Sequence, residues 1–252
     1  MPVSPKEAPP DAFGRTAREY ELGRPLWPEE LVDFVAAELG LSPDATVLDL
    51  GAGTGKLTRA LVPRFARVIA VEPDEAMLAV LQQVVPGAEG LRGSAEAIPL
   101  GDDEVDAVFS AEAFHWFAPE AAAEIVRVLR PGGALVILFN IGIEYDHMGD
   151  EAEALIEEMF ERGGAPGLGR VLSGDWRKPL EAAFEELRET EVERDVVTGR
   201  DEWIATMLSV SSIAHQPEEE RDAFAERLRE LIPADRAVRR RVRTVAYWTW
   251  LV

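Results

Sequence analysis

Residues 47–58 of this sequence read VLDLGAGTGKLT. The run at 46–50 is apolar with β-branched residues, which is typical of a buried parallel strand. It breaks into three glycines and then into KLTRALV at 56–62, which has helical spacing. Glycine permits positive φ and close approach of a ligand, and a helix start adds unpaired N–H groups and a positive dipole end. The stretch therefore predicts the strand, turn and helix that open a βαβ unit.

Two features of this turn bear on the ligand that it would hold. A dinucleotide-binding turn has the spacing G-x-G-x-x-G, whereas here Gly51, Gly53 and Gly55 are followed by Lys56. The third glycine therefore comes one residue early. Asp49 stands at the strand end, where a carboxylate does nothing for a phosphate but suits a ligand with a cationic amino end. The alternative is a buried turn that binds nothing.

The second predicted strand, RVIAV at 67–71, ends at Glu72, Pro73 and Asp74. A carboxylate at this position can accept two neighbouring hydroxyl groups of a ribose, because its two oxygens lie side by side. Asp74 precedes a helical pattern and is predicted to be its N-cap. Met77 in that helix is expected in the core.

Further predicted strands follow at 88–92, 105–110 and 134–139, and a helix is predicted at 119–129. The strand at 88–92 leads into GSAEAIPL at 93–100, and the strand at 105–110 leads into SAEAFHWF at 110–117. In open α/β sheets, ligands bind outside the carboxyl ends of the strands. The sequence therefore predicts one site at the ends of these strands.

These motifs, taken in order, resemble those of the class I S-adenosylmethionine-dependent methyltransferases. The turn at 51–55, the acid at 72, the segment 93–100 and LRPGG at 129–133 each match a family motif. The cluster FHWF at 114–117 resembles the methyltransferase type 11 group, which includes trans-aconitate methyltransferase-like enzymes that act on small molecules. The resemblance implies an α/β fold with a doubly wound, mostly parallel sheet of seven strands and a helical cap.

The resemblance also implies S-adenosyl-L-methionine as the cofactor. The glycine turn would support its methionine part, Asp49 would fix the turn and the amino end, and Glu72 would accept the ribose hydroxyls. Ser94 and Ala95 would read the adenine, more weakly than in the family because Ser94 replaces the common Asp. The predicted cofactor-binding residues are Tyr20, Arg24, Asp49, Gly51, Ala52, Gly53, Thr54, Gly55, Glu72, Pro73, Met77, Ser94, Ala95, Glu96 and Ala111.

Tyr20 and Arg24 belong to a segment that resembles the one folding over the cofactor in many small-molecule methyltransferases. Ordinary surface packing of a helix start explains the same pattern equally well. Met77 is predicted as a core residue that also contacts the adenine.

His115 is the candidate catalytic residue, because it follows the strand at 105–110, where the methyl group should point. It is expected either to contact cofactor or substrate and serve as a base near neutral pH, or to pack between Phe114 and Trp116 and order the loop. Methyl transfer is an in-line displacement, and a base is needed only if the acceptor must lose a proton.

Composition excludes several classes of partner. The formal net charge of -21 opposes nucleic acid and anionic membranes, which need a basic face. The sequence has 0 cysteines, so disulfides, a thiolate nucleophile and Cys-ligated zinc are excluded, and no metal is expected. No apolar run reaches about 18 residues, and the Pro-rich start lacks a signal core. A cytoplasmic location and a small-molecule methyl acceptor are expected.

The predicted organisation is a tail at 1–12, a cofactor-binding core at 13–140, and the remainder of the sheet with a helical cap and substrate region at 141–252. In the last part, strands are predicted at 191–197 and 242–252, helices at 150–162, 178–187, 201–208 and 217–231, and a Gly/Pro loop at 163–169. A protein that binds the cofactor without catalysis and a nucleotide-dependent oxidoreductase remain alternatives. A protein substrate is a weaker one.

Overall fold

The computed structural model describes residues 16–164 and 166–252. The expected tail at 1–12 and the first residues of the expected core, 13–15, lie outside the described residues. The strands are β1 (Thr46–Leu50), β2 (Arg67–Glu72), β3 (Glu89–Arg92), β4 (Val105–Ala111), β5 (Leu129–Tyr145), β6 (Arg188–Gly199) and β7 (Ala237–Trp250). The helices are α1 (Ala17–Gly23), α2 (Glu29–Glu38), α3 (Thr58–Leu61), α4 (Glu75–Val84), η2 (Phe114–Trp116), α5 (Ala121–Val128), α6 (Asp150–Gly163), α7 (Pro166–Ser173), η3 (Asp175–Leu180), α8 (Arg200–Ser209), α9 (Ser211–Ala214) and α10 (Glu218–Leu231).

The strands form one seven-stranded sheet in the order β3-β2-β1-β4-β5-β7-β6. The pairs β1–β2, β1–β4, β2–β3 and β4–β5 are parallel. Strand β7 is antiparallel to both β5 and β6. The predicted mostly parallel sheet is therefore confirmed. The strand order reverses between β1 and β4, and such a switch point leaves a crevice beyond the strand ends.

Both faces of the sheet are covered by helices, as a doubly wound fold requires. On one face, Leu31 and Val35 of α2 pack with Val47 of β1 and Trp248 of β7. On the other face, Ile125 of α5 belongs to the cluster that also contains residues of β1, β4, β5 and η3. Burial of both faces explains why the central strands read as nearly continuous apolar runs.

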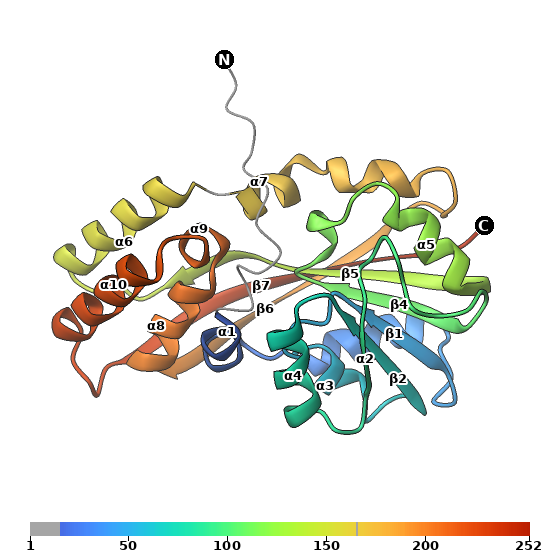
Figure 1. Cartoon of the computed structure of the whole chain (residues 1–252), viewed down its shortest axis with the longest axis horizontal. Helices are drawn as coiled ribbons and strands as arrows, with labels where there is room; N and C mark the ends of the chain where they lie inside the picture. The colour runs from blue at the N-terminus through green and yellow to red at the C-terminus, as the bar shows by residue number, and fades with distance from the viewer. Residues whose placement is uncertain (1–15, 165) are drawn as a thin grey trace, which may run out of the picture.

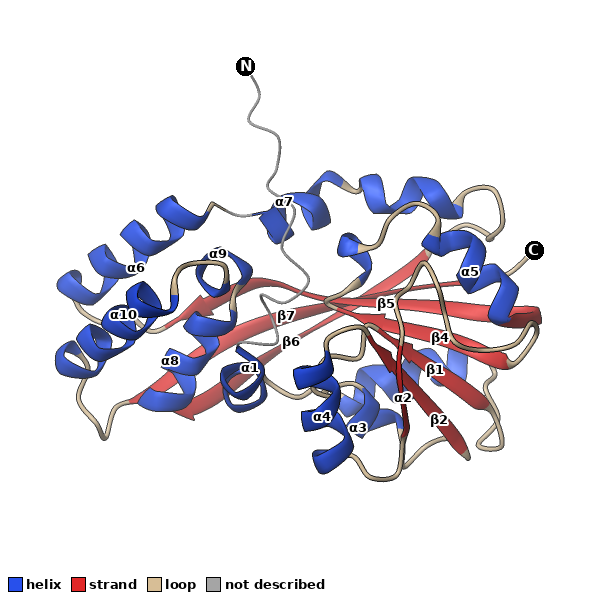
Figure 2. Cartoon of the chain, in the orientation of Figure 1, coloured by secondary structure: helices blue, strands red, loops and turns tan. Residues whose placement is uncertain are grey.

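The C-terminal half builds a separate helical cap, as predicted. Helices α6, α8, α9 and α10 pack around their own apolar cluster, which includes Trp203 and Phe224. Figures 1 and 2 show this group of helices at one end of the molecule, over the long extensions of β5 and β7. Helix α1 lies between the cap and the core and packs on α8. The cap therefore borders the crevice at the strand ends.

Two local predictions are wrong. The helix expected at 178–187 is replaced by the 3-10 helix η3 and turns, because Pro179 lacks an N–H donor and Phe184 is held by a bridge to Leu251. The loop expected at 163–169 is partly α7, which begins at Pro166 and packs against η2, η3 and α9.

The motif at 129–133 lies at the start of β5, where the strand carries a bulge with a register shift opposite Asp106.

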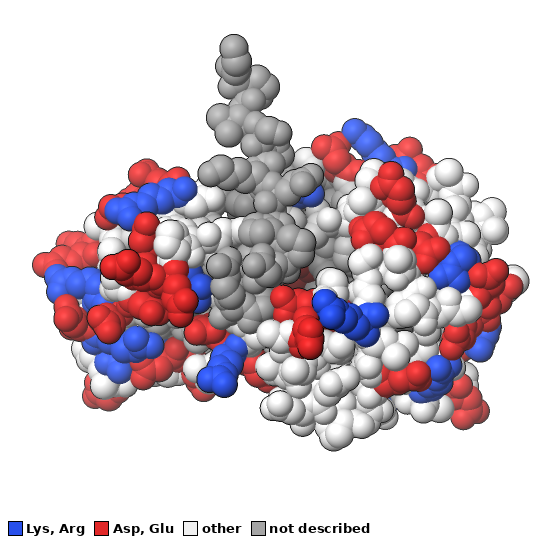
Figure 3. All heavy atoms as spheres, viewed as in Figure 1, with Lys and Arg blue, Asp and Glu red and all other residues white. Residues whose placement is uncertain are grey.

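Within the described residues, no helix is long and apolar enough to cross a membrane. The face displayed in Figure 3 carries acidic and basic side chains intermixed, without a continuous basic surface. On that face, the structure offers no broad basic area of the kind that a nucleic acid requires.

Candidate active site

The turn after β1 is held by hydrogen bonds to the end of β2. The backbone N–H groups of Gly51 and Ala52 donate to the carbonyl of Val71 at 2.9 and 3.1 Å. Gly51, Gly53 and Gly55 have φ values of +72°, +57° and +85°, which favour glycine. A Cβ on Gly51 would also stand 2.6 Å from the Cβ of Ala113. Gly51 is therefore required both by backbone conformation and by the close approach of the segment after β4.

Asp49 is fully buried at the end of β1. Its Oδ2 accepts a hydrogen bond from the hydroxyl of Thr58 at 2.6 Å, whereas its buried Oδ1 has no partner among the described residues. Burial raises the pKa of Asp49 to about 7, and the bond from Thr58 only partly offsets this. The structure therefore leaves one buried carboxylate oxygen that a ligand donor can satisfy.

Glu72 joins the ends of β1 and β2. Its Oε2 accepts from the N–H of Gly53 at 2.8 Å and its Oε1 from the N–H of Asp74 at 2.9 Å. Burial raises its pKa to about 7. Each oxygen keeps further acceptor capacity for a ligand hydroxyl. Asp74 is the N-cap of α4, as predicted, and Met77 is buried in that helix below the turn at Gly53.

Glu112 is a site residue that the sequence did not reveal. It follows β4 with a φ of +55°, a strained conformation for a non-glycine residue. Its Oε1 accepts from the N–H of Asn140 at 2.6 Å. Burial raises the pKa of Glu112 and the charge of Arg24 lowers it. The only signal in the sequence was its place just beyond a strand end, which neighbouring residues share.

Tyr20 and Arg24, in and directly after α1, lie near Asp49, Glu72 and Glu112 at the strand ends. Burial raises the pKa of Tyr20 to about 12, opposed by the charge of Arg24 and increased by those of Glu112, Glu72 and Asp49. The guanidinium of Arg24 lies 5.4 Å from the centre of the Tyr20 ring. The buried carboxylates of Asp49 and Glu72 and the partly buried carboxylate of Glu112 thus lie near Tyr20 of α1 and Arg24, which follows it.

The remaining residues of the glycine turn hold α1 in place. The hydroxyl of Thr54 donates to the carboxylate of Glu21 at 2.8 Å. The same carboxylate pairs with Arg59 at 2.7 Å and with Lys56 at 3.5 Å. The side chain of Thr54, predicted to bind the cofactor, is therefore directed to α1. Glu21 is a second residue that the sequence did not single out.

The residues predicted to bind the cofactor in the segment after β3 differ in their surroundings. Ser94 forms a bridge with Ala97, and Ala95 is buried. The carboxylate of Glu96 accepts from the N–H of Ala118 at 2.9 Å, so it fixes a loop. Pro73 is exposed at the end of β2, and Ala111 is partly exposed at the end of β4. Of the predicted residues, those at the ends of β1 and β2 and those on α1 converge most clearly.

His115 is buried in η2, with ring contacts to Trp116 at 4.9 Å and Phe139 at 5.6 Å. Burial, together with the charge of Arg170, lowers the pKa of His115 to about 4. The imidazole is therefore neutral near pH 7, and the role of His115 as a base or as a contact to cofactor or substrate stays a prediction. Its Nδ1 has no partner among the described residues. His115 and Arg170 line a pocket of about 280 Å³ between η2, α5, α7 and η3.

Comparison with known proteins agrees with this architecture. Residues 48–137 match the family model described as "Methyltransferase domain". The chain is 33% identical over 235 residues, 87% of its length and 88% of the relative's, to an uncharacterized methyltransferase of Schizosaccharomyces pombe. It is 45% identical over 166 residues to one of Mycobacterium tuberculosis, covering 64% of the chain and 63% of that relative's length.

Among solved structures, a putative type II methyltransferase from Anaeromyxobacter dehalogenans superposes with a TM-score of 0.62. The match covers 89% of this chain and 97% of that one, at 24% identity, and so shows the fold. The chain belongs to the methyltransferase family and has its Rossmann-like fold. Family and fold imply S-adenosylmethionine as the methyl donor.

The described residues fit this cofactor. The unpartnered, buried Oδ1 of Asp49 matches a ligand ammonium, which needs an acceptor. The positive-φ glycine turn lets a ligand approach the backbone next to that oxygen. The trans-aconitate-like grouping stays a prediction.

Proposed function

We propose that this chain transfers the methyl group of S-adenosyl-L-methionine to a small-molecule acceptor. The observation that carries the proposal is the buried Oδ1 of Asp49, which has no donor among the described residues, at a place where the charges of Asp49, Glu72 and Glu112 all act on Tyr20. A cation that binds beside a buried carboxylate stabilises its ionised form and lowers its raised pKa. S-adenosylmethionine carries two cationic groups, an ammonium and a sulfonium.

Each side chain has a distinct part in this proposal. Asp49 accepts from the ammonium, and Glu72 accepts from the ribose hydroxyls while it holds the turn through Gly53. The charge of Arg24 acts on both Tyr20 and Glu112, and Arg24 supplies a donor for the ligand carboxylate. The bound cofactor supplies the electrophilic methyl group, and the protein supplies position and electrostatics.

The acceptor is proposed to bind beside His115. The small pocket there is lined by aromatic side chains, which suits a compact organic acceptor. A neutral imidazole can accept a hydrogen bond from the small molecule that is to be methylated, and so hold this molecule in line with the methyl group. With a pKa near 4, His115 is a weak base. An acceptor that carries its own lone pair without a proton to lose fits this site best.

The expected partners follow from charge. The net charge of -21 disfavours nucleic acid as a substrate. Absence of a membrane partner and a cytoplasmic location stay predictions.

Asp49→Asn tests the proposal, because the amide keeps an acceptor for Thr58 but places a donor where the ligand ammonium would lie. Calorimetric titration with S-adenosylmethionine and S-adenosylhomocysteine should show binding to the wild type and at least about a tenfold loss in this variant. Asp33→Asn, at an exposed carboxylate paired with Arg64, is the matched control. Methyl transfer is then measured against a panel of small acceptors.

Two results would contradict the proposal. One is equal binding of S-adenosylmethionine by wild type and Asp49→Asn. The other is tight binding of NADH with no binding of either adenosyl compound, which would indicate an oxidoreductase instead.

A further inference from the structure

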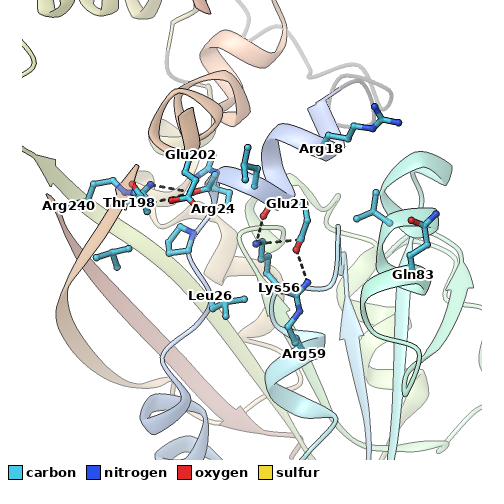
Figure 4. A pocket seen from close by; sticks show the side chains of 15 residues that line it. Arg18, Glu21, Arg24, Leu26, Lys56, Arg59, Gln83, Thr198, Glu202 and Arg240 are labelled. Atoms are coloured by element: carbon cyan, nitrogen blue, oxygen red, sulfur yellow. Dashed lines mark hydrogen bonds and ion pairs between the residues drawn. The ribbon is translucent and has the colours of Figure 1, made fainter. Parts of the chain in front are cut away.

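A second cleft, of about 620 Å³, lies on α1 at the junction of core and cap. Figure 4 shows its labelled side chains, which come from α1 and the segment after it, the turn after β1, α3, α4, β6, α8 and β7. Of the predicted cofactor-binding residues, only Arg24 lines it. It is therefore distinct from the site at the ends of β1 and β2. Its volume falls within the ~300–1,000 Å³ of small-molecule sites.

The cleft is basic although the chain is acidic. Its lining contains the basic residues Arg18, Arg24, Lys56, Arg59 and Arg240 and the acidic residues Glu21 and Glu202. The carboxylate of Glu21 is occupied by Lys56 and Arg59, and that of Glu202 accepts from the N–H of Gly199 at 3.0 Å. The positive charge is therefore not fully balanced by the protein itself.

Arg240 is a buried cation whose hydrogen-bond partners are all neutral. It is 1% exposed; its Nη1 donates to the hydroxyl of Thr206 at 2.6 Å, and its Nη1 and Nη2 donate to the carbonyl of Gly23 at 3.4 and 3.3 Å. Within the described residues it forms no ion pair. Burial and the charge of Arg24 lower the pKa of Arg240, and the charge of Glu202 raises it. Buried charges are normally paired, so an anion is the missing partner.

Two polar atoms at this end of the cleft have no hydrogen-bond partner in the described part of the chain. They are Nε of Arg240 and Oγ1 of Thr198, and both are buried. The two side chains come from paired strands, because Val196 of β6 is in register with Arg240 of β7. Figure 4 shows Arg240 and Thr198 next to each other, with Arg24 close by. A guanidinium and a hydroxyl side by side can donate to two oxygens of one anion.

The other walls of the cleft are apolar. Leu22 and Leu26, which are 56% and 48% exposed, line it together with Val80. Exposed leucines beside a buried cation suit a ligand with one anionic and one apolar part. A phosphate monoester has the charge and the several acceptor oxygens that several basic donors require.

We propose that this cleft binds a small organic phosphate, with the phosphate group at Arg240 and Thr198 and the apolar part against Leu22 and Leu26. This cleft is separate from the pocket proposed for the methyl acceptor. The phosphate proposal therefore does not depend on the identity of that acceptor.

Phenyl phosphate is the probe, titrated by calorimetry at constant ionic strength into the protein, once alone and once in the presence of S-adenosylhomocysteine. Saturable binding is expected. Thr198→Val removes a hydroxyl that has no partner among residues 16–164 and 166–252, so folding should be unaffected while binding weakens about tenfold. Thr190→Val is the matched control, at a position of the same strand that does not line the cleft, and should bind as the wild type does. Arg240→Lys should bind more weakly as well.

Three outcomes would overturn the proposal. The first is absence of saturable binding. The second is equal affinity in Thr198→Val and the wild type. The third is equal affinity for benzoate, a carboxylate of similar size, because the cleft would then lack the preference for phosphate.

Discussion

Relative to the wild type, the ligand-free Asp49→Asn protein should gain stability as the pH rises. Burial raises the pKa of Asp49 from 3.8 to about 7. An acid with a raised pKa binds its proton more tightly in the folded state than in the unfolded state. Its contribution to stability is therefore fully present below the unfolded pKa and is lost as the pH rises through about 7.

The magnitude follows from this shift. Between pH 5 and the folded pKa of about 7 lie about two pH units, each corresponding to about 1.4 kcal/mol. The wild type should lose roughly 2–3 kcal/mol through Asp49 between pH 5 and pH 8. Asp49→Asn cannot lose it, because the amide does not titrate. Its own burial cost is independent of pH and cancels in this difference.

Urea unfolding of both proteins at pH 5 and pH 8, without ligand, measures the effect. The difference in the free energy of unfolding between variant and wild type should grow by roughly 2–3 kcal/mol in favour of the variant. Asp33→Asn, at an exposed site with a lowered pKa, should show no such growth. A pH-independent difference for Asp49→Asn would refute the reasoning that burial holds this carboxyl protonated.

Three further predictions concern ligand binding and the turn. At pH 6, a group with a pKa of about 7 is roughly nine-tenths protonated, so binding of S-adenosylhomocysteine should release protons from Asp49 and Glu72. Calorimetry in two buffers of different ionisation enthalpy counts the released protons. A count of zero would contradict the pairing of the ligand with these two carboxylates. Gly51→Ala should lower both the melting temperature and the cofactor affinity, because a Cβ would stand 2.6 Å from the Cβ of Ala113. The control is Gly132→Ala, where φ is +74° but nothing lies within 4 Å of the added Cβ. It should cost only about 1–2 kcal/mol of backbone strain and leave the affinity unchanged. The ring signals of His115 should not titrate between about pH 6 and pH 8, because burial and the charge of Arg170 lower its pKa to about 4. An NMR titration with a midpoint between pH 6 and pH 8 would contradict this lowering of the pKa.

Much of the fold could be predicted because its signals are local. The apolar runs of β1, β2 and β4 and the glycine turn at 51–55 reflect burial and backbone conformation of contiguous residues. Asp49 and Glu72 could be placed at strand ends for the same reason. Local signals failed at α7, where contacts to η2, η3 and α9 outweigh the poor helix propensity of its two glycines.

The sequence by itself determined the sheet, the glycine turn and the two acids that flank it, because each depends on neighbours within one strand and its following turn. Only the tertiary structure decided the rest of the site. Arg24 is fixed by Ser209, 185 residues away, and Arg240 donates to Gly23 across 217 residues. Such contacts form only when the cap, α1 and the core pack together. The strained Glu112, the neutral His115 and the unbalanced charge of Arg240 all arise from that packing, since burial rather than residue type sets their properties.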